Sequence, residues 1–205
     1  MTRYRNGMTA EADLDDGPGL PEWLIPPPQG FVAEDLDRLP GLPLHAELID
    51  GSLVFFSPQT AFHSCSLSLF QLELGRAVPP GFRVLRRTSL ILDEDQRPQP
   101  DLCVTRFDGP RDPGHAYRGH DVRLVAEVVS ADSRSRDRKR KPALYAEAGI
   151  PHFWRVENDR GRPVVYVYEL DPATASYVVT GIHRGRLRLA VPFEVDIDLA
   201  RIDHF

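Results

Sequence analysis

The sequence predicts an α/β (α+β) domain in which a mixed β-sheet is flanked by helices. Two longer segments with helical periodicity lie among many short strand-like segments, which is the pattern of this fold class. The run Val122–Val129 is apolar at six of its eight positions, as is typical of a central strand covered on both faces. The length of 205 residues suits one domain that buries its own core.

The chain divides into a leader and a domain. Residues 1–30 are acidic and rich in proline, with little hydrophobic periodicity, and we expect them to be disordered. The domain is expected over residues 31–205. It should open with a short helix from Phe31 to Leu39, which Gly41 and Pro43 end.

A hairpin and a long helix are expected next. The dipeptide Asp50-Gly51 is a hairpin signal between the strand-like segments Ala46–Ile49 and Leu53–Phe56. The segment Ala61–Val78 repeats apolar residues at helical spacing, and it stops at Pro79-Pro80-Gly81.

The middle of the chain alternates between strands and loops. A loop rich in Gly, Pro and His is expected from Asp108 to Asp121. The expected strands of this region are Phe82–Leu85, Ser89–Leu92, Leu102–Phe107 and Val122–Val129.

A basic stretch then leads into a second helix. The eight residues Arg134–Lys141 hold six positive charges and one negative charge, which is a credible phosphate-binding segment or else a solvated helix start. Pro142 is tolerated only near a first turn, so the helix is expected to begin near Asp137, with Asp137 as its cap, and to end near Gly149.

Four further strands are expected in the C-terminal part of the chain. The segments are His152–Val156, Pro163–Leu170, Tyr177–Thr180 and Leu187–Val191, and the last three resemble an antiparallel meander.

Composition excludes several classes of protein. No stretch approaches the 18 apolar residues of a membrane span, and two cysteines without a CxxC pair favour a reducing cytoplasm over a disulfide framework. Neither GxxxxGK[ST] nor GxSxG occurs, which argues against a P-loop NTPase and a serine hydrolase. The net charge of −5 combines −7 in residues 1–50 with +2 in residues 51–205, so a polyanionic partner is not excluded.

Two carboxylates are the first candidates for chemistry. Glu127 lies within the most apolar strand, where a carboxylate is costly unless it is paired or bound to a cation, although a solvent-facing edge strand would also tolerate it. Asp101 follows Pro100 at the head of another strand, where a plain turn residue is the alternative. If neighbouring strands bring the two together, Mg²⁺ or Mn²⁺ would relieve their repulsion, because these ions prefer oxygen ligands.

Lys141 is the next candidate. Arginine supplies 23 of the 25 basic residues, and the only lysines, Lys139 and Lys141, lie in one short stretch. A lysine kept in so arginine-rich a chain indicates a need for a compact ammonium, although chance placement on a basic face is the alternative.

Several segments together resemble the Uma-type family of restriction endonucleases, within the PD-(D/E)XK nuclease superfamily. The resemblance covers roughly residues 31–205. Its segments are Ala46–Gly51, Ser57-Pro58 with His63, Pro100-Asp101, the Glu127 strand and Asp137–Trp154.

The resemblance implies a restriction-endonuclease-like fold and a Mg²⁺-dependent (or Mn²⁺-dependent) enzyme that hydrolyses the phosphodiester bonds of DNA. Asp101 and Glu127 would be the metal ligands. Val129 stands where the general superfamily motif has a lysine, and Lys141 matches the helix lysine that the Uma-type pattern uses instead. Glu47 matches the family glutamate, which would ligate a second ion or orient Lys141; a solvent-facing strand residue is the alternative.

Other residues are expected around this centre. His63 could face the cleft from the long helix, although a lone histidine is more often structural. Asp137 and Tyr145 share the helix face of Lys141 at helical spacing. The arginines expected to contact the DNA backbone are Arg134, Arg136 and Arg138. A homodimer is a further expectation, since cutting both strands of a duplex favours two active sites.

Two alternative functions stay open from the sequence. The first is a catalytically inactive nuclease-fold module that binds nucleic acid or another partner. The second is a small-molecule hydrolase or metal-binding protein of unrelated fold, in which His115, His120 and Asp121 would form a metal loop, although their spacing matches no strong ligand motif.

Overall fold

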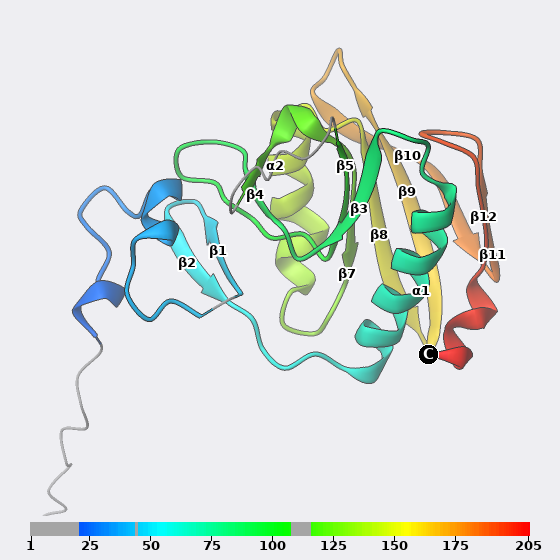
Figure 1. Ribbon diagram of the computed structural model, residues 1–205, viewed down its shortest axis with the longest axis horizontal. Helices are drawn as coiled ribbons and strands as arrows, with labels where there is room; N and C mark the ends of the chain where they lie inside the picture. Colours follow the sequence, from blue (N-terminus) through cyan, green and yellow to red (C-terminus); the bar gives the residue numbers. More distant parts are fainter. Residues whose placement is uncertain (1–20, 44, 108–115) are drawn as a thin grey trace, which may run out of the picture.

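The computed structural model describes residues 21–43, 45–107 and 116–205 (Figure 1). Most of the predicted leader, residues 1–20, lies outside the described residues, and residues 21–30 hold one short 3-10 helix, Glu22–Leu24. Among the described residues, no helix has the length and apolar character needed to cross a membrane.

A six-stranded mixed sheet forms the centre of the protein, as predicted. Its strands run in the order β10-β9-β8-β7-β5-β3, and only the pair β7 and β8 is parallel among the neighbours in this sheet. Their bounds are β3 (Phe82–Arg86), β5 (Leu102–Arg106), β7 (Val122–Val128), β8 (His152–Asp159), β9 (Arg162–Asp171) and β10 (Ser176–Arg184). Every residue of β7 except Arg123 is buried, which confirms its predicted central place.

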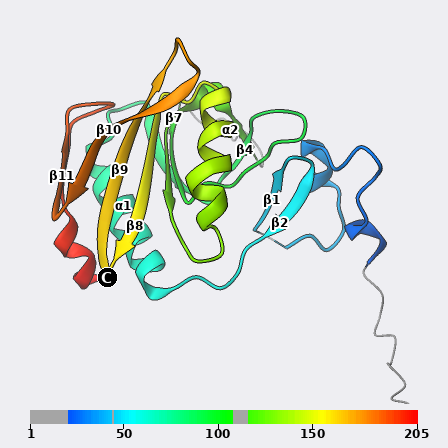
Figure 2. The same cartoon turned by 180° about the vertical axis from the view of Figure 1, so that it is seen from behind.

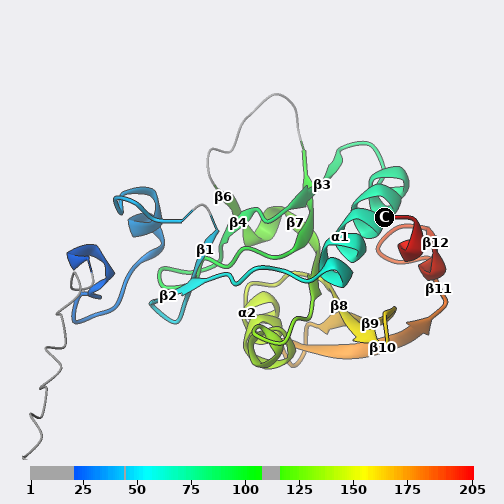
Figure 3. The same cartoon turned by 90° about the horizontal axis from the view of Figure 1, so that it is seen from below.

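Each face of the sheet packs against its own helix. Helix α1 (Ala61–Ala77) lies on one face, where Leu67, Phe70 and Leu74 join the larger of two apolar clusters. Helix α2 (Lys141–Glu147) lies on the other face, where Tyr145 and Phe153 belong to the second cluster. Figure 3 shows the two helices on opposite sides of the sheet. Successive residues of β7 therefore alternate between two apolar environments.

The N-terminal hairpin matches its prediction closely, with strands β1 (Ala46–Ile49) and β2 (Ser52–Phe55) around Asp50-Gly51. The helix predicted over Phe31–Leu39 is instead a 3-10 helix, Ala33–Asp37. Pro40 has no N–H to continue the helix, which keeps this element short.

The helix that carries Lys141 begins earlier than predicted. The chain is helical from Arg134, and Arg136–Arg140 form a π-helical turn in which the Lys141 N–H donates to the carbonyl of Arg136. Asp137 therefore lies inside the helix and does not cap it. The π-helical turn accommodates Pro142, which has no N–H to donate. The helix therefore continues past the proline without a break.

Outside the main sheet, two short strands were not predicted and a third pairs differently from its prediction. Strand β11 (Arg186–Leu189) does not extend the β9–β10 meander; the chain turns at Gly185, with φ of 71°, and β11 pairs with β12 (Val195–Asp198). The predicted loop Asp108–Asp121 contains β6 (Ala116–Arg118), which pairs in parallel with β4 (Ser89–Ile91), while residues 108–115 lie outside the described residues.

We expect Gly51→Ala to lower the free energy of unfolding by about 1–2 kcal/mol, because Gly51 has φ of 67° in the hairpin turn and an L side chain is strained there. Gly75→Ala is the matched control, since Gly75 lies in α1 with open space around its Cα and alanine favours a helix. Urea denaturation would measure both, and equal effects would contradict this account of the turn.

Candidate active site at the ends of β5 and β7

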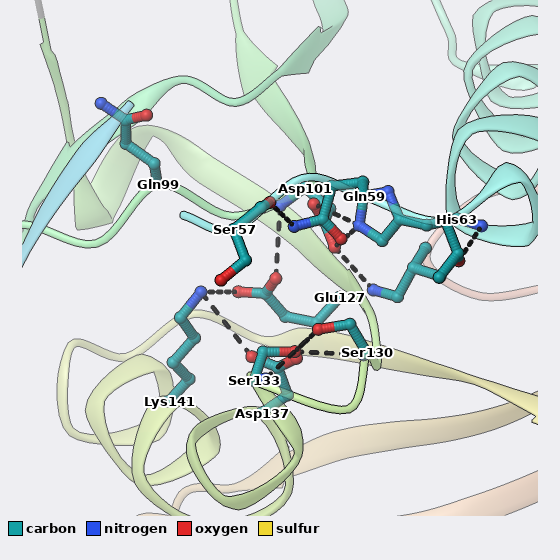
Figure 4. Close-up of polar contacts among 12 residues, drawn as sticks. Ser57, Gln59, His63, Gln99, Asp101, Glu127, Ser130, Ser133, Asp137 and Lys141 are labelled. Atoms are coloured by element: carbon teal, nitrogen blue, oxygen red, sulfur yellow. Dashed lines mark hydrogen bonds and ion pairs between the residues drawn. The ribbon is translucent and has the colours of Figure 1, made fainter. Parts of the chain in front are cut away.

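Four segments distant in sequence bring charged side chains into one buried cluster (Figure 4). Asp101 lies directly before β5, and Glu127 lies near the end of β7, its antiparallel neighbour. Lys141 opens α2, and Glu47 lies on β1. The four side chains that the sequence singled out as catalytic candidates are thus in one place.

Backbone N–H groups hold the two predicted metal ligands beside each other. The Val128 N–H donates to Asp101 Oδ2 at 2.8 Å, and the Asp101 N–H donates to Glu127 Oε2 at 3.3 Å. These two contacts join the start of β5 to the end of β7. The two carboxylates therefore come from neighbouring antiparallel strands and lie at the same end of the sheet.

The Lys141 ammonium lies among three carboxylates. Its Nζ is 2.7 Å from Glu47 Oε1, 3.1 Å from Glu127 Oε1 and 3.7 Å from Asp137 Oδ1. Burial acts to lower the Lys141 pKa, but the surrounding acidic groups outweigh it, so the pKa lies well above its usual value. Lys141 is therefore a fixed positive charge, and the helix face that it shares with Asp137 confirms the predicted spacing.

Glu127 and Asp137 are the carboxyl groups most affected by burial. Burial raises the pKa of Glu127 well above its usual value, against the opposing effect of Lys141. Burial raises the pKa of Asp137 to about 6 from 3.8. The Tyr145 hydroxyl donates to Glu127 Oε1 at 2.5 Å, so Tyr145 orients the carboxyl that also contacts Lys141.

His63 contacts Asp101 from the first turn of α1. Thr60 caps the helix by accepting from the His63 N–H, which fixes the position of the histidine. The His63 Nε2 lies 3.0 Å from Asp101 Oδ1 and 3.1 Å from Oδ2, and the ring is buried. The structure therefore brings this candidate into the cluster as a neighbour of Asp101.

Gln99 and Phe56 adjoin the cluster and were not predicted from the sequence. The Gln99 N–H donates to Glu47 Oε1 at 2.8 Å, and the Lys141 Nζ lies 5.9 Å from the centre of the Phe56 ring. Gln99 stands two residues before Asp101, and this proximity to the Pro-Asp pair was the one signal that could have pointed to it.

The charge balance of the cluster suits a hard cation. The cluster holds four buried carboxyl groups, those of Glu47, Asp101, Glu127 and Asp137, and all but Asp101 contact the one lysine; the oxygens Glu47 Oε2 and Asp137 Oδ1 have no hydrogen-bond partner. Within the described residues no three or more His, Cys, Asp or Glu side chains are arranged as a ready metal cage. Two carboxylates with water in the remaining positions is the coordination that Mg²⁺ accepts.

The predicted DNA-binding arginines lie along the outside of the same helix. Arg134 is exposed and Arg136 is partly exposed. Arg138 donates to both oxygens of Glu157 at 2.8 Å, which ties this helix to β8. Glu157 holds Arg138 in place, and binding of DNA by the three arginines stays a prediction.

The cluster is closed to solvent. No member of the set Glu47, Asp101, Glu127, Asp137 and Lys141 has more than 6% of its surface exposed. Beside the cluster, the segment between β2 and α1 lines a cavity of about 530 Å³ that includes Phe56, Ser57 and Gln59.

The alternative metal loop gains no support from the described part of the chain. His115 lies outside the described residues. His120 Nε2 is 3.6 Å from Asp121 Oδ1 on the surface, which is a loose exposed pair and not a ligand set.

Comparison with a crystal structure supports the fold. The protein is similar to one from Anabaena variabilis described as a putative nuclease belonging to DUF820, with a TM-score of 0.62 and 17% identity. The match covers 79% of this chain and 89% of the other. Comparison with curated proteins finds no match.

A family comparison covers most of the chain. The family described as “Uma2: Putative restriction endonuclease” matches residues 33–200, a range that contains all the residues of the buried cluster. The sequence segments, the mixed sheet and this match agree, and the chain belongs to the Uma2 family of restriction-endonuclease-like proteins.

Proposed function

We propose that this protein is an endonuclease that uses Mg²⁺ or Mn²⁺ to hydrolyse phosphodiester bonds of DNA. The observation that supports the proposal is the meeting of Asp101, Glu127 and Lys141 in one buried cluster, although they come from distant parts of the sequence. Carboxylates that bind a hard cation and an ammonium beside them are the groups that phosphodiester hydrolysis needs.

Asp101 and Glu127 would hold the cation, with the backbone carbonyl of Val128 as a further oxygen ligand. A divalent cation at this position supplies Lewis acidity toward a phosphoryl oxygen and lowers the pKa of a bound water. The oxygens without hydrogen-bond partners and the excess of carboxylates over cationic groups support this assignment.

Other groups of the chain would prepare the site for the phosphate. Lys141 would orient the attacking water or stabilise negative charge on the phosphoryl group. Glu47 holds Lys141, and Tyr145 holds Glu127, so each fixes the orientation of a reacting group. His63 does the same for Asp101.

A second candidate function is a nuclease-fold protein that binds DNA without cutting it. The observation that favours it is the closed state of the cluster, since a buried Lys141 held by three carboxylates also stabilises the fold. This candidate predicts that the protein retains DNA and shows no Mg²⁺-dependent cleavage. Self-association into a homodimer stays a prediction in both cases.

Asp101→Asn and Lys141→Gln are each expected to reduce Mg²⁺-dependent or Mn²⁺-dependent cleavage of plasmid DNA by about 100-fold or more, since each removes a charge from the proposed reacting centre. Agarose gels of supercoiled plasmid would measure the rate.

Lys139→Gln is the matched control for this experiment, because Lys139 is exposed and lies two residues before Lys141. This variant should cut DNA at the rate of the original protein. Circular dichroism would establish that each variant is folded. Cleavage that survives both site substitutions would reject the proposed roles, and cleavage by none of the proteins would favour the DNA-binding candidate.

The buried carboxyls predict an unusual pH dependence of stability. The pKa of Asp137 is about 6 in the folded protein and 3.8 as its ordinary value, so the folded state binds the proton more tightly. The stabilisation that protonated Asp137 contributes to the folded state is fully present below about pH 4. It is lost as the pH rises through about 6. Raising the pH from about 5 to about 7.5 should therefore cost about 1 kcal/mol through Asp137.

The comparison with Asp137→Asn isolates this contribution, because asparagine cannot ionise. The original protein should lose about 1 kcal/mol more than this variant over the same pH range in urea denaturation without metal. Mg²⁺ should restore more stability at the higher pH, since it binds ionised carboxylates. Identical pH profiles for the two proteins would show that Asp137 is not a strained buried acid.

A further inference from the structure

A row of side chains leads from the buried cluster across the sheet. The register aligns Glu127 on β7 with Arg155 on β8, and Arg155 with Tyr166 on β9. Ile182 on β10 continues the row, opposite Tyr166. Residues in register share a face, so the row lies on the α2 side of the sheet.

Helix α2 leaves part of this face uncovered. In Figure 2 α2 stands to the right of β8, and it contacts β10, while no helix of the described residues lies in front of the rest of β9 and β10. Val179 and Ile182 are 50% and 57% exposed there, and Tyr166 and Tyr168 are partly exposed. Apolar and aromatic groups on an open sheet face indicate a binding surface.

Arg155 stacks on the tyrosines of this surface. Its guanidinium carbon lies 4.6 Å from the ring centre of Tyr166 and 5.4 Å from that of Tyr168. Beside it a groove of about 330 Å³ separates α2 from β9 and β10, and Arg138, Arg155, Tyr168 and Tyr177 are among its lining residues. The Arg155 side chain is 15% exposed, so the part that reaches the surface lies beside the tyrosine rings.

The charge of this surface is positive near the buried cluster. Arg138 and Arg155 share one carboxylate, since Arg138 donates to both oxygens of Glu157 and the Arg155 Nε lies 3.1 Å from Glu157 Oε1. Two guanidinium groups on one carboxylate leave a net positive charge. Arg138 belongs to the same helix as Lys141, so the positive charge of Arg138 lies on the element that carries a group of the proposed reacting centre.

We propose that the surface formed by Arg138, Arg155, Tyr166, Tyr168 and Ile182, here called the stacking face, binds the DNA strand that flanks the cleaved bond. The bases stack on Arg155 and the tyrosines, and Arg138 contacts a phosphate. Aromatic groups beside positive charge are the usual means of binding an unpaired or splayed strand without sequence preference. The inference rests on the proposed function, because it names a subsite for the same substrate.

The row of side chains indicates how the DNA strand would be positioned for cleavage. Arg155 is the direct neighbour of Glu127 in the parallel pair β7 and β8, so a base stacked on Arg155 lies one strand away from the cluster. Neighbouring strands are about 4.8 Å apart, so a base beside Arg155 would lie close to the Glu127 carboxyl group. The stacking face therefore positions the polymer next to the reacting groups.

The test measures DNA affinity separately from cleavage. Fluorescence anisotropy of a short labelled single-stranded oligonucleotide in EDTA gives Kd without cutting. Tyr166→Leu and Arg155→Gln should each weaken binding about tenfold, the effect of losing one stacked base. Arg186→Gln is the matched control, because Arg186 forms a similar surface pair with Asp196 far from the cluster and should change Kd by less than about twofold.

A second pair of variants keeps the test valid if Tyr166→Leu does not fold. Ile182 lies on the stacking face, and Val178 lies on the opposite face of the same strand with a similar exposed fraction. The two variants to compare are therefore Ile182→Ser and Val178→Ser. Weaker binding by Ile182→Ser alone supports the inference. Light scattering of the same proteins would measure their oligomeric state. If Ile182→Ser separates a dimer and leaves DNA affinity unchanged, the occupant of the face is a second copy of the chain, and the inference is overturned.

The two proposals fail in different ways. Cleavage by the original protein with unchanged affinity in Tyr166→Leu, Arg155→Gln and Ile182→Ser would overturn the stacking face and leave the endonuclease intact. Binding that depends on these residues without any cleavage would overturn the endonuclease and support the stacking face. Absence of measurable DNA binding would overturn the stacking face.

Discussion

The buried ammonium of Lys141 is the interaction on which the site depends. It joins Glu47 of β1, Glu127 of β7 and Asp137 of its own helix, so three separate elements meet at one charge. Removing charges from water is costly, and the cost is offset only when the partners are close and well oriented. The ion pair therefore fixes the N-terminal hairpin and α2 against the end of β7, and the same contacts hold together the residues of the proposed site.

The topology supports this arrangement. The parallel pair β7 and β8 requires a crossover, and the helix that makes the crossover carries both Asp137 and Lys141. The π-helical turn before Pro142 keeps these residues on one buried face while the proline passes without a broken helix. On the sheet itself, the alternation of β7 places Glu127 toward α2 and its neighbours Ala126 and Val128 in the core against α1. One crossover thus places the helix of Lys141 against the central strand that carries Glu127.

The sequence predicted the long elements well because their patterns are local. The periodicity of α1, the apolar run of β7 and the Asp-Gly hairpin all follow from spacing within a few residues. The errors fell where the chain departs from regular strand or helix geometry. Strand β11 pairs with β12 because the chain turns at Gly185, and the helix of Lys141 begins early because a π-turn accommodates Pro142. Neither preference is visible in local propensity.

The sequence by itself indicated the family, the fold class and the candidates Asp101, Glu127 and Lys141. Glu127 and Lys141 are unusual residue types in their local setting, whereas Asp101 was singled out by its combination with Glu127 and by the Pro-Asp pair of the family pattern. Only the tertiary structure decided which partners these groups have. Tyr145 on Glu127, His63 on Asp101 and Gln99 on Glu47 come from elements whose contacts depend on strand order and helix packing. A buried charge is recognisable from its neighbours in sequence, but the groups that balance it are neighbours in space.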